Sequence, residues 1–369
     1  MPPARKALNC LLCALLLCSP RAQADDSTLP RDSAWLLAAN QARHLRDAAK
    51  FRFEMDNDIA FGSDNQFSNG WGLRIFTARA HSWDTLDGPP AWSLEFGKHF
   101  PGLNGAHLQV RTGFAVGQII NTPSDIERTE LIENDVPYVG LLAGQMSWMA
   151  FSDLDLRAVE MTLGTLGQAS LGEQGQNLIH SWTGSDIARG WANQVNDEVV
   201  FNLNYVSKDK ITGSQTSGRN WDLALSRGWA LGTIFTHVEA GLDIRFGRNM
   251  PGGFASTPEI MGRSISHDAT LPPPIRNKGS LYGSLSLSAN YFFHHLLLDG
   301  SLLSTRHGKW VERYKLIGTA NLGFHYERPE WALHLQWVNT TDTVRVDELP
   351  NNGDKMNRFL SLMLEWKIQ

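Results

Sequence analysis

Apolar and polar residues alternate strictly in many short stretches from Phe51 to the end of the chain. Within Phe51–Asp56, apolar residues alternate with Arg52, Glu54 and Asp56, and in Arg358–Ile368 a leucine-rich set alternates with polar residues. Successive side chains of a strand point to opposite faces, so each stretch predicts a β-strand with one apolar and one polar face. The fold class expected from this pattern is all-β.

Twelve stretches show the alternation, and twelve is an even number, as a closed antiparallel bacterial barrel requires. A further stretch, Trp92–Phe100, is compatible with a short strand or a helical turn. The expected strands are Phe51–Asp58, Trp71–Arg79, Leu108–Ile120, Tyr138–Ala150, Leu156–Gly164, Val199–Ser207, Trp221–Leu231, Thr233–Phe246, Leu281–Leu298, Arg313–Tyr326, Trp331–Asn339 and Arg358–Ile368.

The first residues of the chain have the features of a secretory signal. Arg5 and Lys6 precede the apolar run Leu8–Cys18, and Ala22-Gln23-Ala24 supplies the small residues that a signal peptidase reads. We therefore expect residues 1–24 to be a signal peptide that is cleaved after Ala24. All three cysteines lie within it, so the mature chain has no disulfide and no thiolate metal site.

Alternating strands occur in soluble β-sandwiches as well as in membrane barrels, so the pattern alone does not place the chain in a membrane. The predicted export and the length of the strands favour the membrane barrel. No later segment approaches the roughly 18 consecutive apolar residues of a transmembrane helix. Stretches of about ten residues that end in Trp, Tyr or Phe are instead typical of an outer-membrane barrel. Residues 51–369 are therefore predicted to form one twelve-stranded antiparallel transmembrane barrel in the outer membrane, with a monomer expected.

Two of the segments outside the predicted signal peptide and strands are the leader before the barrel and a long loop within it. The leader, residues 25–50, favours a helix over Ser33–Ala49 and has no assigned function. The Gly- and Pro-rich segment Gly247–Lys278 is incompatible with regular structure over much of its length and is either a functional loop or partly disordered. The formal net charge of −5, with no basic stripe, argues against nucleic acid as a partner.

Gly172–Asp186 interrupts the strand pattern and carries Gln176 and His180 four residues apart. At helical spacing these two side chains share one face, which predicts a short helix in an extracellular loop. A single histidine on a short amphipathic helix is more often a packing or surface residue than a catalytic one. The neighbouring motifs decide between these two interpretations of His180.

Polar residues also gather where the first predicted strand ends. Asp56-Asn57-Asp58 closes that strand and Ser68-Asn69-Gly70 begins its hairpin partner, so Asp58 and Ser68 are expected at the same rim. Carboxylate, hydroxyl and amide oxygens suit Ca²⁺ better than zinc. Taken alone, Asp-Asn-Asp at a strand end is more often a turn whose side chains cap their own backbone.

Five motifs in succession carry a family resemblance. FEMDNDIAFGSDNQFSNGW, GQIINTPSD, NDVPYVGLL, GEQGQNLIHSWTGSD and GWANQVNDE resemble, in order and spacing, the outer-membrane lipid A 3′-O-deacylase family. The specific resemblance extends from about Phe51 to Asn204. Beyond Asn204 only the general barrel pattern is shared.

The resemblance implies a Ca²⁺-dependent barrel enzyme that hydrolyses the ester of the 3′ acyloxyacyl group of lipid A. It places the general base on His180, with Gln176 and Asn57 as further catalytic residues. It places the metal on Asp58 and Ser68, the latter standing where relatives have threonine. A third metal ligand, Asp186, stands where a relative has glutamate.

The chain departs from the family at one place. Relatives carry a basic residue beside Pro-Tyr-Ala-Gly, whereas Val136 precedes the corresponding segment Pro137–Gly140, and Arg128 is the nearest substitute. A cationic helper for substrate phosphate or for an oxyanion is therefore in doubt.

The chemistry is consistent without the family. Ester hydrolysis needs a base that titrates near ambient pH, which histidine supplies, and a positive charge for the oxyanion, which Ca²⁺ supplies. No Gly-x-Ser-x-Gly motif indicates a serine nucleophile. Two alternatives remain: a non-enzymatic porin or surface-binding barrel, and a barrel phospholipase with a serine–histidine pair.

Overall fold

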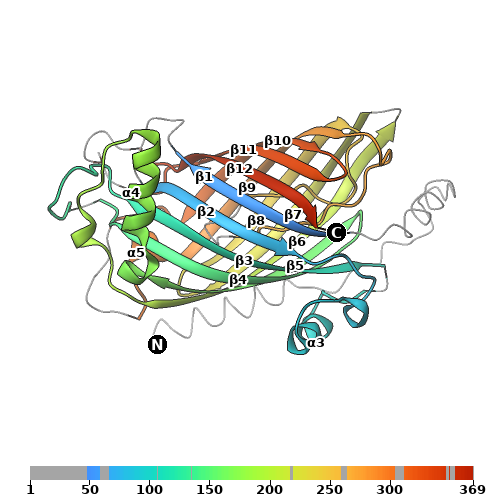
Figure 1. The fold of residues 1–369 in the computed structure, drawn as a ribbon, viewed down its shortest axis with the longest axis horizontal. Coiled ribbons are helices and arrows are strands. Elements are labelled where there is room, and N and C mark those ends of the chain that lie inside the picture. The colour runs from blue at the N-terminus through green and yellow to red at the C-terminus, as the bar shows by residue number, and fades with distance from the viewer. Residues whose placement is uncertain are drawn as a thin grey trace. The chain divides into compact units, whose positions relative to one another are not determined.

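The computed structural model describes residues 48–58, 66–105, 107–133, 135–216, 219–258, 264–303, 311–345, 349 and 354–368. These residues form a closed barrel in which each strand is antiparallel to both neighbours (Figure 1). The strands are β1 Ala49–Asn57, β2 Gln66–Phe76, β3 Gln109–Thr122, β4 Val139–Phe151, β5 Asp155–Leu166, β6 Val199–Thr216, β7 Arg219–Gly232, β8 Phe235–Arg248, β9 Ser280–His295, β10 Leu316–Glu327, β11 Trp331–Thr340 and β12 Arg358–Ile368.

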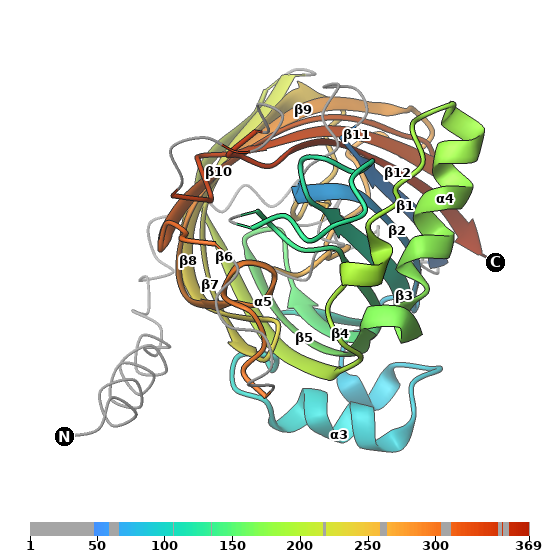
Figure 2. The same ribbon diagram turned by 90° about the vertical axis from the view of Figure 1, so that its left-hand side faces the viewer.

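The barrel closes between its first and last strands. Ala49 of β1 lies opposite Ile368 of β12, and the pairing continues to Asn57 opposite Leu360 (Figure 2). The predicted twelve-stranded antiparallel barrel is confirmed. None of the helices that the structure describes is long and apolar enough to cross a membrane.

The alternation seen in the sequence separates the inside of the barrel from the outside. Arg52, Glu54 and Asp56 are buried in the interior, and their apolar neighbours along β1 are partly exposed. Many large apolar side chains are exposed to the surroundings of the barrel instead. They include Leu73, Ile75, Leu242, Ile244, Leu322, Phe324, Leu335 and Trp337.

The two ends of the barrel carry different additions (Figure 1). At one end, the α4 end, lie the β1–β2 and β5–β6 connections, with the helix α4 Gly172–Thr183 and the short helix α5 Leu296–Asp299. At the other, the α3 end, β12 ends and the β2–β3 connection carries the helix α3 Ala91–His99. The stretch Trp92–Phe100 is therefore a helix, and its strand interpretation was wrong.

Two strands, β2 and β6, extend five or more residues beyond the prediction at one end. β2 begins at Gln66, five residues before Trp71, because a bulge between Phe67 and Asn69 hides the alternation there. β6 continues past Ser207 to Thr216, and its charged stretch is neutralised by carboxylates of β7 and β8. Within that stretch Lys208 pairs with Asp243 at 3.1 Å and Lys210 with Asp222 at 2.9 Å.

Other predicted ranges were too long: β2 ends at Phe76 and not at Arg79, and the ranges for β9 and β10 extended into the connection between them. β9 ends at His295, and Leu296–Leu298 belong to α5. These three leucines do not alternate with polar residues, and all are buried against other apolar side chains. Likewise Arg313 precedes β10 and is held by an ion pair with Asp299 at 2.6 Å.

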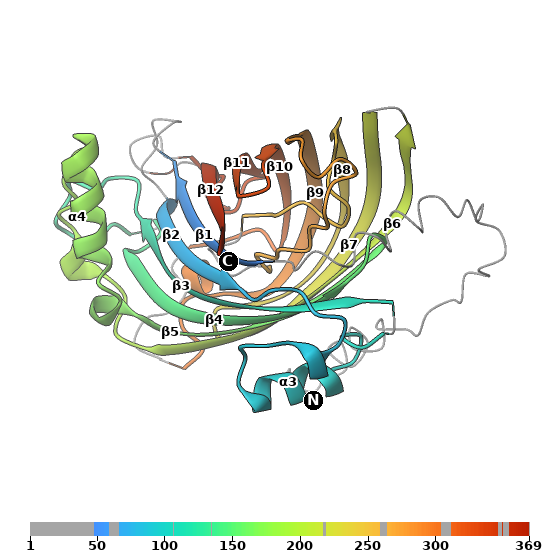
Figure 3. The ribbon, with the colours of Figure 1, turned by 45° about the vertical axis from the view of Figure 1, so that its right-hand side comes forward.

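The segment between β8 and β9 folds into the lumen near the α3 end (Figure 3, gold). Asp268 of this segment binds the side chains of Lys50 on β1 and Arg111 on β3. Arg52 donates to Ser266 Oγ at 2.9 Å. As expected, the segment forms no helix or strand in its described part, but its contacts fix it inside the barrel.

Three sequence predictions fall mainly outside the described residues. They are the signal peptide 1–24, most of the leader 25–50 and most of the helix expected over Ser33–Ala49. Ala49, the last residue of that expected helix, begins β1.

Candidate active site

The helix α4 lies on the outer wall of the barrel, against β3 and β4 (Figures 1 and 2). Leu171 precedes it in a left-handed conformation with φ 59°. Gly184 ends it with φ 76°, donating its N–H to the carbonyl oxygen of His180. This is a left-handed C-cap for which glycine is favoured. The predicted short helix is confirmed, at the same end as the β1–β2 hairpin.

Glycines allow α4 to approach the wall closely. A Cβ atom on Gly140 of β4 would lie 2.9 Å from the Cα atom of Gly172, the first residue of the helix. A Cβ on Gly175 would collide with the side chain of Gln118 on β3. Gln118 itself donates to the carbonyl oxygen of Ser170 at 2.6 Å and accepts from Trp71 Nε1 at 3.1 Å. The helix is therefore held against the wall by backbone contacts and by Gln118.

The wall-facing side of α4 carries the predicted catalytic pair. Gln176 is fully buried and His180 is 6% exposed, and they lie one helical turn apart. Leu178 and Trp182 lie on the opposite side and are 51% and 79% exposed. The two polar residues therefore face the protein, and the apolar ones face outward.

The ring of His180 is oriented by a backbone carbonyl. Its Nδ1 atom lies 2.5 Å from the carbonyl oxygen of Asp186. A carbonyl oxygen only accepts hydrogen bonds, so Nδ1 carries the proton in the neutral ring. Nε2 is then the acceptor nitrogen, as a general base requires.

Gln176 is held by Trp191, which lies in the short 3-10 helix η5, Trp191–Asn193. The indole Nε1 donates to Gln176 Oε1 at 3.0 Å. The Trp191 ring lies 4.9 Å from the ring of Tyr138, and both are buried in one cluster with Ile120 of β3. Gln176 Nε2 is buried and has no hydrogen-bond partner among the residues that the structure describes.

The end of the β1–β2 hairpin gathers oxygen-bearing side chains. Asn57 Nδ2 donates to the carbonyl oxygen of Ser68 at 3.1 Å, and Asp58 is 1% exposed. Ser68 Oγ lies 2.5 Å from Thr122 Oγ1 on β3. The structure thus brings Asn57, Asp58 and Ser68 together, as the sequence predicts.

The strand register connects this hairpin to α4. Asn57 lies directly opposite Asn69, and Asn69 lies opposite Ile120, which belongs to the same buried cluster as Trp191. Neighbouring strands lie roughly 5 Å apart, so Asn57 lies about 10 Å from Ile120. The candidate site therefore lies on the outer wall at the α4 end.

Asp186 has an exposed side chain, and its backbone carbonyl oxygen contacts His180. The metal-ligand role of its carboxylate stays a prediction. Among the described residues, no group of three or more His, Cys, Asp and Glu is arranged to hold a metal. The hairpin still offers a carboxylate, a hydroxyl and the buried Asn69 Oδ1, which lacks a hydrogen-bond partner in the described structure. These hard oxygens fit Ca²⁺, which does not require an all-acidic ligand set.

The position where relatives carry a basic residue is apolar here. Val136 is 1% exposed and packs in a cluster with Leu298. Arg128, the nearest substitute in sequence, has its Nε 4.0 Å from Glu130.

The comparison with protein families matches the model of outer membrane protein LpxR to residues 11–367. The chain belongs to this family. It is therefore an outer-membrane protein of the lipid A deacylase family that the five motifs resemble. No curated protein sequence matches the chain.

Solved structures support the fold. LpxR from Salmonella typhimurium aligns with a TM-score of 0.66 at 13% identity, covering 86% of this chain and 100% of that one. The beta domain of the Bordetella autotransporter BrkA gives 0.38 at 10% identity, covering 88% and 100%. The NalP translocator domain from Neisseria meningitidis gives 0.37 at 6% identity, covering 91% and 94%. The last two scores are too low to indicate more than a general likeness.

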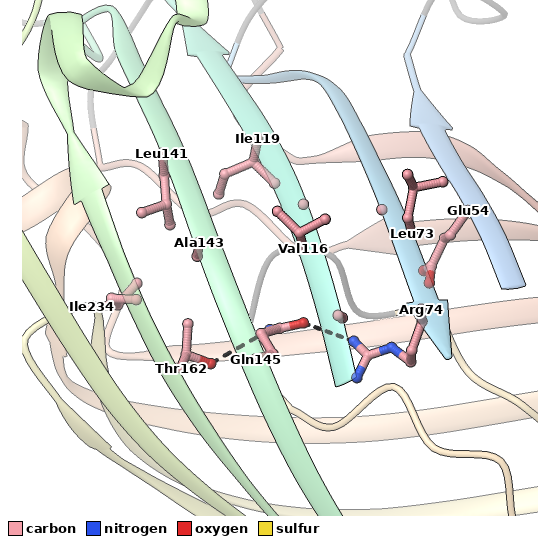
Figure 4. Close-up of a pocket in the computed structure, with 13 residues that line it drawn as sticks. Glu54, Leu73, Arg74, Val116, Ile119, Leu141, Ala143, Gln145, Thr162 and Ile234 are labelled. Atoms are coloured by element: carbon pink, nitrogen blue, oxygen red, sulfur yellow. Dashed lines mark hydrogen bonds between the residues drawn. The ribbon is translucent and has the colours of Figure 1, made fainter. Parts of the chain in front are cut away.

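Two cavities in this LpxR-family barrel lie away from α4. One, of about 20 Å³, adjoins Arg74, Gln145 and Thr162 (Figure 4). Arg74 donates to Gln145 at 2.7 Å across it. The other, of about 90 Å³, is lined by polar side chains that include Asp243 and His267. A space of about 10–15 Å³ holds one water, so neither cavity accommodates a lipid.

Sequence reasoning missed Trp191, Asn69 and Thr122 as residues of this site. The GWANQ motif contributes to the family resemblance but predicts no role for its tryptophan, because a tryptophan in a loop gives no signal that its indole reaches a helix. Asn69 was seen in Ser-Asn-Gly, but the bulge after Phe67 decides which way its side chain points.

Proposed function

We propose that the protein hydrolyses the ester that joins the 3′-O acyloxyacyl group to lipid A, with His180 activating water. The observation that carries the proposal is the orientation of His180 on the wall-facing side of α4. Its Nδ1 donates to the Asp186 carbonyl, which makes Nε2 the acceptor. The site lies on the outer wall, where a membrane lipid reaches it without entering the barrel.

In this mechanism His180 Nε2 takes a proton from water as the water oxygen attacks the ester carbonyl carbon. The tetrahedral intermediate then collapses, and the bond between that carbon and the sugar oxygen breaks. The imidazolium returns its proton to the departing sugar oxygen, so the products are a fatty acid and a free hydroxyl. The Asp186 carbonyl stabilises the imidazolium while it exists.

Gln176 contributes a hydrogen-bond donor. Its Oε1 is engaged by Trp191, and its buried Nε2 has no partner in the described structure. A preorganised N–H donor stabilises charge that develops on an ester carbonyl oxygen. Asn57, whose amide is held by the Ser68 carbonyl, lines the neighbouring part of the site.

Asp58 and Ser68 would hold Ca²⁺, with the Asp186 carboxylate as the third proposed ligand. When bound, Ca²⁺ supplies positive charge near the oxyanion. The buried carboxylate of Asp58 and the hydroxyl of Ser68 support this assignment.

The two alternatives find less support. A porin needs an open lumen, whereas residues 264–272 occupy part of it, with Ser266 and Asp268 in contact with Lys50, Arg52 and Arg111. A serine–histidine pair does occur, with Ser284 Oγ 2.8 Å from His325 Nε2. Both side chains face the interior, and His325 is fully buried, so this pair is not exposed to membrane lipid.

The test is the mass of lipid A extracted from a host that lacks such an enzyme. Expression of the wild-type chain should lower the mass by one acyloxyacyl group, and expression of His180→Ala should leave it unchanged. An unaltered lipid A mass with correctly inserted wild-type barrel would refute the proposal.

A further inference from the structure

We infer that Trp191 is a positioning residue for the reaction: its indole N–H fixes the side-chain amide of Gln176 so that Nε2 points into the site as a donor. The inference rests on the proposed function and assigns a role to the GWANQ motif. It starts from one hydrogen bond, Trp191 Nε1 to Gln176 Oε1 at 3.0 Å, between two fully buried side chains.

That hydrogen bond identifies which terminal atom of the Gln176 amide is the oxygen and which is the NH₂ nitrogen. An indole nitrogen only donates, so the atom it contacts must be the amide oxygen. The opposite atom is therefore the NH₂ group. This NH₂ is buried and has no partner among the described residues. A buried donor without a partner costs free energy in the resting protein, and a substrate oxygen would satisfy it.

The indole is itself held in place by the barrel. Its ring packs against Tyr138, whose hydroxyl donates to the carbonyl oxygen of Ile126 at 3.0 Å. Gly190 permits this approach, because a Cβ there would lie 2.5 Å from the Tyr138 ring. The N–H of Arg189 also donates to the Ile126 carbonyl, at 2.8 Å.

The indole also limits where α4 lies. A Cβ on Gly172 would come within 2.9 Å of the Trp191 ring, so the first residue of the helix rests directly on it. Trp191 therefore contacts the same helix at two points one turn apart, at Gly172 and at Gln176. Within the described structure the indole nitrogen is engaged by Gln176, so Trp191 influences the reaction through Gln176 and not by touching the substrate.

The substitution Trp191→Phe keeps an aromatic ring and removes the N–H. Because Gln176 is expected to donate to charge that develops only in the transition state, kcat should fall roughly tenfold with KM nearly unchanged. Gln176→Glu keeps an acceptor for the indole but removes the NH₂, and it should lower kcat by more, about 10²-fold.

A double-substitution cycle separates positioning from packing. If Trp191 acts through Gln176, Trp191→Phe should have little further effect in a Gln176→Ala background. The matched control is Trp148→Phe at the α3 end. Trp148 is equally buried and donates its indole N–H to the Ser93 carbonyl at 2.9 Å, far from α4. Full activity of Trp191→Phe, or an equal loss in both backgrounds, would overturn the inference.

A second measurement does not depend on activity. In ¹⁵N-tryptophan-labelled wild-type barrel, the Trp191 indole proton should exchange slowly and should exchange faster in Gln176→Ala, while Trp148 stays unchanged. Unaltered Trp191 exchange would refute the hydrogen bond. If exchange behaves as expected but wild-type protein leaves lipid A intact, the proposed function fails and the positioning of Gln176 stands.

Discussion

His180 is oriented by a main-chain carbonyl where catalytic triads use a carboxylate. A carbonyl fixes the tautomer as well as a carboxylate does, but its partial negative charge stabilises the imidazolium less than the full charge of a carboxylate would. The orientation of His180 therefore does not depend on which side chain stands at position 186. Asp186→Ala should leave the ring in place, so a loss of activity there reports on the carboxylate.

The first prediction concerns the base. His180→Ala should lower turnover by roughly 10²–10⁴, the range for loss of general-base catalysis. Heat-modifiable migration should stay normal, because α4 lies outside the barrel wall. The control is His99→Ala, exposed on α3, and undiminished turnover by His180→Ala would exclude the assignment.

The second prediction concerns the metal. A Ca²⁺-selective chelator should stop hydrolysis, and added Ca²⁺ should restore it. Asp58→Asn removes one charge from a hard-oxygen site, so the Ca²⁺ concentration for half-maximal activity should rise about tenfold or more. Asp84→Asn, an exposed residue at the α3 end, serves as the control. Full activity in chelator would contradict the metal assignment.

At the scale of elements, the glycine contact between β4 and α4 sets the distance from helix to wall. Gly140 and Gly144 lie on the same face of β4, four residues apart. A Cβ on Gly140 would meet Gly172 Cα at 2.9 Å, whereas a Cβ on Gly144 has nothing closer than 3.9 Å. The two positions form a matched pair for testing whether α4 must sit this close.

The third prediction uses that pair. Gly140→Ala should displace α4 and lower turnover by at least tenfold, because a shift of about 1 Å in catalytic groups costs up to roughly 10² in rate. Gly144→Ala should be close to wild type. Both barrels should insert and migrate normally, and the measured quantity is the rate of lipid A hydrolysis. Equal rates in the two variants would mean that the close contact is not needed.

At the scale of the whole molecule, a buried ion network ties the lumen segment to the wall. Asp268 contacts Lys50 and Arg111, and Lys50 also contacts Glu365 at 3.3 Å. Burial favours the neutral carboxyl of Asp268, but the charges of Lys50 and Arg111 outweigh it and hold its pKa well below the usual value.

The fourth prediction concerns this network. Asp268→Asn removes the carboxylate that Lys50 and Arg111 share, leaving Glu365 as the remaining carboxylate on Lys50, and should lower the free energy of unfolding by about 3–5 kcal/mol, measured by urea unfolding in detergent. Asp84→Asn, which loses an exposed ion pair with Lys98, should cost about 1 kcal/mol or less. Similar stabilities for the two variants would show that the lumen segment contributes little.

The same network gives a pH dependence with a definite sign. The pKa of Asp268 is lower in the folded than in the unfolded chain, so its contribution is fully present above the unfolded value of about 3.9. It is lost as the pH falls below that value. The barrel should therefore lose stability in acid, and Asp268→Asn should lose less.

The sequence alone determined the strands, their faces and their number, because side-chain alternation is a local property that each strand carries along its own length. β12 was predicted to the residue, since every second residue from Leu360 to Ile368 is apolar and the residues between them are mostly polar. Strand boundaries predicted from alternation were wrong at three places where the pattern is broken. These are the Phe67 bulge, the charged end of β6 and the leucine run Leu296–Leu298.

The tertiary structure alone decided what meets at the site and in the lumen. Gln176 and His180 share a helix face by local spacing, but the contact of Gln176 with Trp191 depends on how the β5–β6 connection folds back onto the wall. Asp268 reaches Lys50 across 218 positions of the chain, a pairing that no periodicity encodes. Such contacts depend on the closed barrel, which brings segments that are far apart in the sequence close together in space.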